Sequence, residues 1–154
     1  MAAYYALVLI PYCDRLLYGY LRANAWLANV VLNWLGQDSH VSEITIRSAA
    51  FGITVRRGCD AIEPSWFFCA ALLAFPAPVG SKVAGILAGT LLLQALNLLR
   101  IVSLYFIGRH YPGVFGVAHL EIWPVVFIVA AMLLWVGWIA WTKRLAKDIP
   151  HAAR

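Results

Sequence analysis

The chain has 154 residues, of which 63% are hydrophobic and only 12% are charged, and its formal net charge is +5. Soluble domains carry about 25% charged residues, so this composition excludes an ordinary soluble protein and indicates an integral membrane protein. The basic excess does not require a nucleic-acid partner, because basic residues flank membrane spans and meet anionic lipids.

The chain begins with an apolar run at 1–13, which predicts a short first membrane span. Residues 15–35 follow, and they mix arginine and asparagine with leucine, valine and tryptophan at helical spacing. We interpret this segment as an amphipathic helix that lies at the membrane interface and ends at Gly36. A second full span is disfavoured, because Arg22 would then lie well inside the bilayer.

The next segment, 43–57, is the only strand-like part of the sequence. The stretches "EITIR" (43–47) and "GITVR" (52–56) alternate apolar and polar residues and are rich in β-branched side chains. Two such stretches joined by a few residues predict a β-hairpin. Because an isolated hairpin is marginally stable, we expect it to pack on the interfacial helix.

Three further apolar stretches, 60–76, 82–108 and 118–142, predict membrane spans. A basic tail at 143–154 follows the last of them. With the short first span this gives about four transmembrane helices. The predicted fold is an all-α polytopic membrane protein in which 1–154 form one membrane-embedded domain, with the hairpin as its only β-structure.

The basic cluster "KRLAK" (143–147) after the last span predicts a cytoplasmic tail, because such clusters tend to remain in the cytoplasm. Tracing the spans backwards from the tail places the hairpin, Cys59 and the 108–118 loop on the outer side. Arginines on that side, such as Arg56 and Arg109, depart from the charge rule.

Arg100 is the residue that most strongly suggests a function, because it interrupts the long apolar stretch "LLLQALNLLRIVSLYF". An arginine at membrane depth is costly and usually faces a bundle interior or a wet cavity. Asn97 and Ser103 lie one turn to either side and extend a polar stripe along the same helix face. The alternative is a structural arginine whose long side chain reaches the interface.

Cys59 is the candidate nucleophile. Its neighbours Arg56 and Arg57 are cationic, and a helix is predicted to begin beside it, so both features favour the thiolate. Asp60 and Glu63 oppose this effect unless they cap the helix or pair with the arginines. The alternative is a structural interfacial cysteine.

His119 opens the last predicted span on the outer side and is the candidate general acid/base. A nucleophile, a base and a cation on one leaflet match the requirements of covalent acyl transfer. In that chemistry the thiolate of Cys59 attacks a carbonyl, His119 moves the proton and Arg100 stabilises the oxyanion. A metal site that uses Glu63 or Glu121 beside these residues has no supporting spacing motif, so we expect neither a metal nor a cofactor.

The sequence resembles the exosortase/archaeosortase transpeptidases, most closely the compact exosortase H branch. The resemblance covers most of the chain and rests on "RRGCDAIEPSWFFCAALLAFP", "LNLLRIVSLY" and "AHLEIWPVVF". It implies the catalytic residues Cys59, Arg100 and His119, and the same motifs contain Asn97, Arg57 and Glu63 as supporting residues. Related members often have Asn-Gly after the cysteine, whereas this chain has Asp-Ala.

The resemblance implies a cysteine-type endopeptidase/transpeptidase of the bacterial inner membrane with its active site facing outward. Its partners would be exported proteins that end in a short motif, a hydrophobic span and a basic tail. The enzyme would cut near the motif through a thioester and pass the protein to a lipid or cell-surface acceptor. The alternative is a non-catalytic membrane subunit that binds a partner's transmembrane tail, for which Gly85 and Gly89 give small-xxx-small spacing.

Overall fold

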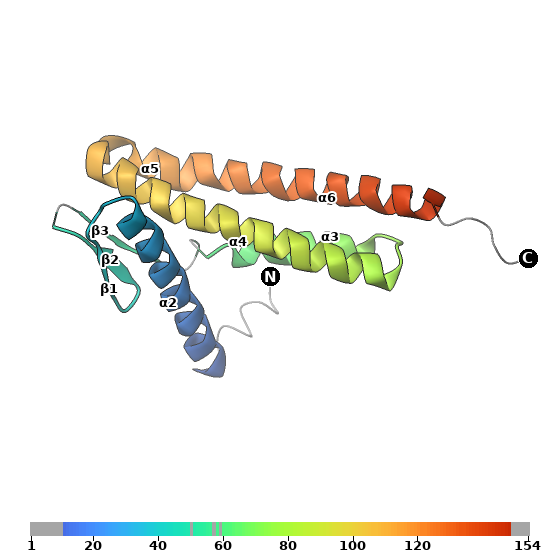
Figure 1. Ribbon diagram of the computed structural model, residues 1–154, viewed down its shortest axis with the longest axis horizontal. Coiled ribbons are helices and arrows are strands. Elements are labelled where there is room, and N and C mark those ends of the chain that lie inside the picture. Colours follow the sequence, from blue (N-terminus) through green and yellow to red (C-terminus); the bar gives the residue numbers. More distant parts are fainter. Residues whose placement is uncertain (1–10, 50, 57, 59, 149–154) are drawn as a thin grey trace, which may run out of the picture. The chain divides into compact units, whose positions relative to one another are not determined.

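The computed structural model describes residues 11–148 except Ala50, Arg57 and Cys59 (Figure 1). The chain divides into two compact units. The sheet unit comprises Met1–Asp60 with Asn97–Ala118, and the helix unit comprises Ala61–Leu96 with His119–Arg154. The prediction of a single membrane-embedded domain stays a prediction.

The sheet unit begins with helix α2 (Pro11–Trp34), which covers the predicted interfacial helix and starts a few residues before it. One face of α2 is buried, and its apolar members recur every three or four residues, as an amphipathic helix requires: Leu21, Ala25, Ala28 and Leu32. Trp26 and Trp34 lie on the exposed surface of the same helix. The pattern of apolar residues therefore orients α2 toward the sheet.

The predicted hairpin is a three-stranded antiparallel sheet in the order β1-β2-β3. Its strands are β1 (His40–Ser42), β2 (Thr45–Arg47) and β3 (Gly52–Thr54). The hairpin prediction was incomplete because it missed β1, which joins β2 through Glu43, whose φ of 59° makes a tight turn. β1 contains a single β-branched residue, Val41, and lacks the alternation that identified the stretches around β2 and β3.

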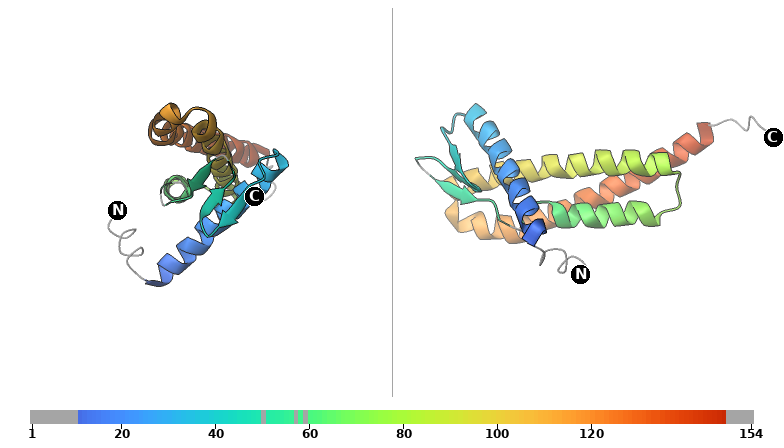
Figure 2. Two further views of the ribbon diagram at one scale, coloured as in Figure 1. Left: turned by 90° about the vertical axis from the view of Figure 1, so that its left-hand side faces the viewer. Right: turned by 90° about the horizontal axis from the view of Figure 1, so that it is seen from below.

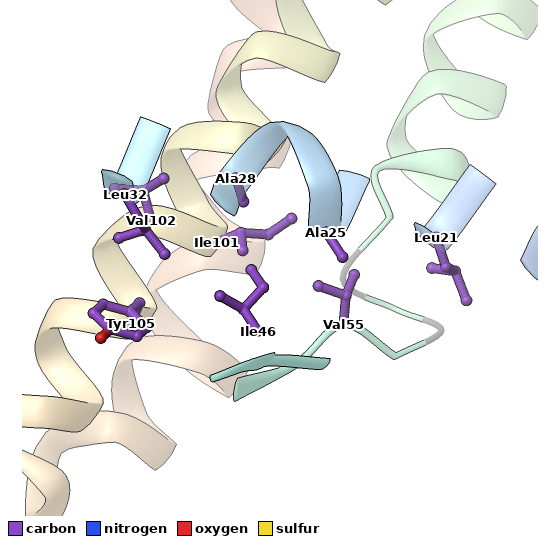
Figure 3. Close-up of a cluster of buried hydrophobic side chains, with 9 residues drawn as sticks. All are labelled: Leu21, Ala25, Ala28, Leu32, Ile46, Val55, Ile101, Val102 and Tyr105. Atoms are coloured by element: carbon purple, nitrogen blue, oxygen red, sulfur yellow. The ribbon is translucent and has the colours of Figure 1, made fainter. Parts of the chain in front are cut away.

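The core of the sheet unit lies between α2, the sheet and the C-terminal part of α4 (Val79–His110) (Figure 3). Figure 3 shows Ile46 of β2 next to Ile101 of α4, and Val55 next to Ala25 of α2. The hydroxyl of the buried Tyr105 donates a hydrogen bond to the Ser48 hydroxyl over 2.6 Å. This core fixes the last turns of α4 against the sheet.

The helix unit consists of α3 (Ile62–Ala74), the N-terminal part of α4 and α6 (Trp123–Asp148), which lie side by side (Figure 2). A Cβ added at Gly89 would lie 2.0 Å from the ring of Phe68, and one at Gly85 would lie 2.3 Å from the indole of Trp138. The two glycines therefore allow aromatic side chains of α3 and α6 to approach the backbone of α4 closely.

Two helical segments are long and apolar enough to cross a membrane, Val79–His110 and Pro112–Arg144, among the residues that the structure describes. Ile62–Ala74 is a shorter apolar helix. At about 1.5 Å per residue its 13 residues are shorter than a bilayer core of about 30 Å. The predicted first span, 1–13, lies almost entirely outside the described residues, so the number of four spans stays a prediction.

The chain between α4 and α6 is not one regular helix. It passes through η1 (Pro112–Val114), α5 (Phe115–Val117) and a π-helical turn, η2 (Ala118–Ile122). The π turn has a local cause in Pro124, which lacks an N–H for the carbonyl of Leu120 and whose ring would clash with that carbonyl in an α-helix. The wider turn accommodates the ring where the apolar helix begins.

Candidate active site

The loop that leads into α3 has a backbone with two left-handed residues. Gly58 has a φ of 88° and Ala61 a φ of 56°. Asp60 between them is buried, with 2% of its surface exposed. Cys59 and Arg57 lie outside the described residues. Cys59 precedes the first residue of α3, Ile62, by three positions, and this agrees with the prediction of a helix start beside it.

Two side chains hold the backbone carbonyls on either side of Cys59. Arg100 of α4 donates a hydrogen bond from Nη1 to the carbonyl oxygen of Gly58 over 3.1 Å. Tyr20 of α2 donates from its hydroxyl to the carbonyl oxygen of Asp60 over 2.5 Å. Gly58 and Asp60, which flank Cys59 in the sequence, are therefore each bonded to a different helix of the sheet unit.

Arg100 is buried, with 6% of its surface exposed, although it is a charged residue in an apolar helix. Burial of a charge is costly unless the group is hydrogen-bonded, and the Gly58 carbonyl supplies one such bond. The guanidinium thus lies inside the protein at the end of the cysteine loop. The prediction that Arg100 faces an interior is confirmed, whereas its catalytic role stays a prediction.

Asn97 lies one turn before Arg100 and is completely buried. Its Nδ2 donates to Oδ1 of Asn24 on α2 over 3.1 Å, and its own Oδ1 has no hydrogen-bond partner among the described residues. Two asparagines thus join α2 to α4 through a buried polar contact. This contact supports the helix that carries Arg100.

His119 is half-buried and lies in the π-helical turn η2. Such turns are rare and occur often at functional sites. His119 belongs to the helix unit and Arg100 to the sheet unit. The convergence of Cys59, Arg100 and His119 therefore stays a prediction.

Glu63 is exposed in the first turn of α3. A carboxylate there is favoured by the helix dipole, so this residue stabilises the start of the helix that follows the cysteine loop. No group of three or more histidine, cysteine, aspartate or glutamate side chains is arranged to hold a metal ion within the described part of the chain.

A groove of about 530 Å³ lies in the sheet unit beside the end of β3, and it is lined by Asp14, Leu17, Tyr18, Leu21, Ile44 and Arg56. Desolvation and the neighbouring Glu43 carboxylate raise the pKa of Tyr18, whose hydroxyl donates a hydrogen bond to that carboxylate. The groove therefore combines an apolar floor with charges of both signs.

Sequence reasoning missed Tyr20 and Asn24, which lie one turn apart on α2. The position of Asn24 could have indicated its role, because it falls within the apolar stripe formed by Leu21, Ala25 and Ala28. A polar residue on the buried face of an amphipathic helix indicates a polar partner. Its partner Asn97, 73 positions away, was identified in the polar stripe of the later helix, but nothing in the sequence indicates that the two asparagines meet.

The apolar helices and the buried Arg100 are typical of a helical membrane protein. A small sheet and the loop that contains Cys59 belong to the same unit. Residues 1–136 match the model of one protein family, Transmembrane exosortase (Exosortase_EpsH). The chain therefore belongs to the transmembrane exosortase family, and the resemblance seen in its motifs is confirmed. No curated protein and no solved structure matches the chain.

Proposed function

We propose that this chain is a membrane cysteine protease/transpeptidase that cleaves the C-terminal sorting signal of exported proteins and transfers them to an acceptor. Family membership supports a transpeptidase-like role in the membrane. The observation that carries the assignment to this site is the anchoring of both carbonyls that flank Cys59, by Arg100 and Tyr20. A nucleophile held on a fixed backbone can be presented to a scissile carbonyl in one orientation.

In the proposed reaction the thiolate of Cys59 attacks the scissile carbonyl carbon, and the carbonyl oxygen becomes an oxyanion that Arg100 stabilises. The C–N bond then breaks, and the leaving amine takes a proton from His119. The product is a thioester between the exported protein and Cys59. An acceptor nucleophile gives its proton to His119 and attacks the thioester carbonyl carbon; the C–S bond breaks, which releases the thiolate of Cys59 and transfers the protein to the acceptor.

The location that fits this function is the bacterial inner membrane, with about four spans and the cysteine loop on the outer side. Its substrates are exported proteins with a C-terminal motif, a hydrophobic span and a basic tail. The acceptor is a lipid or another cell-surface nucleophile.

The test is co-expression of the chain with a tagged exported protein that carries such a tail. Wild type should shorten the tagged protein, while Cys59→Ala, Arg100→Ala and His119→Ala should leave it at full length at equal enzyme levels. Retention of processing by all three variants would exclude this mechanism.

The alternative is a non-catalytic subunit that binds a transmembrane tail, and one observation favours it. An apolar groove of about 420 Å³ runs along α4 and α6 in the helix unit, lined by residues such as Ala88, Leu92, Leu133 and Gly137. The rate of thiol labelling against pH separates the two functions, because a nucleophilic Cys59 should react well below the ordinary cysteine pKa of about 8.5. An ordinary titration would favour the binding subunit.

A further inference from the structure

The outer edge of β3 has backbone groups that the sheet does not use. The N–H of Ser48 donates to the carbonyl of Phe51 over 2.9 Å, and the N–H of Val55 donates to the carbonyl of Ile44 over 2.8 Å. Hydrogen-bonded and non-hydrogen-bonded pairs alternate along an antiparallel ladder. The register that pairs Thr45 with Thr54 therefore belongs to the non-hydrogen-bonded set.

It follows that the N–H and C=O groups of Gly52 and Thr54 point away from β2, toward the open edge. Both residues are exposed, and the exposed surface of a glycine is backbone. Among the described residues no hydrogen bond to these four groups is found. Unpaired edge groups of this kind are a template for another strand.

The opposite edge of the sheet is closed at Ser39, the residue directly before β1. Beside β1, the Asn33 side chain of α2 accepts from the N–H of Ser39 over 2.7 Å and donates to its carbonyl over 3.0 Å. One edge is thus bonded to a helix of the same unit. The edge that remains available is the one formed by β3, which continues through Arg56 to Cys59.

We propose that an extended segment of the substrate polypeptide adds to the outer edge of β3 as a fourth strand, and this rests on the proposed function. Strand addition supplies main-chain hydrogen bonds that do not depend on sequence. Gly52 and Thr54 offer two donors and two acceptors to such a segment. The added strand runs alongside the residues that lead to the anchored cysteine loop.

The groove beside Arg56 and Ile44 then receives side chains of the motif. Its apolar floor and its two opposite charges, Asp14 and Arg56, suit a polar or charged side chain with an apolar stem. The edge gives general affinity, and this groove gives the preference for a motif. A second copy of the chain could also pair through β3, so the test must separate the two occupants.

The test uses a chain with Thr54→Cys as its only cysteine, in which Cys59, Cys13 and Cys69 are replaced by alanine. It is co-expressed with a tagged exported reporter whose tail contains one cysteine, moved along the residues before its hydrophobic span. Facing residues of paired strands lie about 4.5–5.5 Å apart at Cβ, and side chains alternate between faces. We expect the strongest disulfide cross-link at the one reporter position that faces Thr54, weaker cross-links two positions to either side, where the separation is about 7–8 Å, and none at the positions between.

Ser42→Cys in the same background is the matched control, because Ser42 lies opposite Thr45 and shares the exposed face with Thr54 on the closed side of the sheet. It should give no alternating cross-links. In the active chain, Thr54→Pro should reduce tail processing at least tenfold, because it removes an outward N–H without touching the ladder. Thr45→Val removes the same hydroxyl contact between Thr45 and Thr54 from the central strand, leaves the edge residues unchanged and should process the tail as wild type does.

The outcomes separate the two proposals. Processing by wild type with uniform or absent cross-links overturns strand addition and leaves the proposed function. Alternating cross-links without any processing support strand addition and overturn the proposed function, and absence of both overturns both. A disulfide between two Thr54→Cys chains in place of the reporter cross-links identifies a second copy as the occupant and overturns strand addition by substrate.

Discussion

The guanidinium of Arg100 donates a hydrogen bond to the backbone carbonyl of Gly58, the residue directly before Cys59. The bond connects α4 to a loop that lies 42 positions earlier in the chain. A buried charge thus bonds this loop from α4, while Tyr20 bonds it from α2. In the proposed reaction the arginine has two roles, to hold the residue before the nucleophile and to stabilise the oxyanion.

Arg100→Lys should reduce tail processing at least tenfold, because lysine lacks the planar fork that bonds in fixed directions. The matched control is Arg109→Lys on the same helix, where the guanidinium is exposed and donates to the Gln37 side chain. This control should retain nearly full processing. Equal activity of the two variants in the co-expression assay would show that only the charge at Arg100 matters.

Tyr20→Phe should lower processing several-fold while the protein remains folded, because it removes only the hydroxyl that bonds the Asp60 carbonyl. We expect the loss in the rate of acylation at saturating substrate, because the hydroxyl of Tyr20 bonds the loop carbonyl of Asp60. Tyr111→Phe, an exposed tyrosine of the same unit, is the control. If both variants process the tail like wild type, the bond from Tyr20 does not orient the cysteine.

The buried pair of Asn24 and Asn97 should behave as one unit in unfolding experiments. Asn24→Leu or Asn97→Leu alone leaves the other side chain without its bond, which costs about 1–3 kcal/mol. The double variant removes both polar groups and should cost less than the sum of the two. Unfolding midpoints in detergent micelles measure this double-mutant cycle, and strictly additive effects would indicate independent asparagines.

Ala61→Gly should stabilise the protein slightly. Ala61 has a φ of 56°, and a left-handed conformation costs a residue with a Cβ about 1–2 kcal/mol, whereas glycine loses about 0.5–1 kcal/mol through backbone entropy. Ala70→Gly in the middle of α3 is the control and should destabilise by about 1 kcal/mol. The same detergent unfolding should give opposite signs, and matching losses would contradict strain at position 61.

The local parts of the fold could be predicted from sequence because their causes are local. β-branched alternation at 43–47 and 52–56 predicted two of the three strands, and the isolated charge in an apolar helix predicted a buried Arg100. The first strand was missed because His40–Ser42 contains one β-branched residue and is not part of a longer alternating stretch. The π turn was missed although Pro124 signals a disturbed helix start.

The candidate site was less predictable because its contacts depend on which helices pack together. Nothing near Tyr20 in the sequence indicates that its hydroxyl reaches the Asp60 carbonyl 40 positions later. The same holds for the Asn24–Asn97 pair. The exchange of Asn-Gly for Asp-Ala after the cysteine was visible in the sequence, but only the backbone shows that Ala61 occupies a conformation that glycine adopts more easily.

The π-helical turn at Ala118–Ile122 has a consequence for the direction of His119. Each residue of an α-helix turns the chain by about 100° around the helix axis. The extra residue of the π turn therefore changes the direction in which His119 points, relative to the side chains of α6. Deletion of Leu120 would convert the turn to α-helix and swing the imidazole around the axis, while Trp138 of α6 stays against Gly85. A change of one residue in this turn can therefore redirect the histidine without repacking the helices.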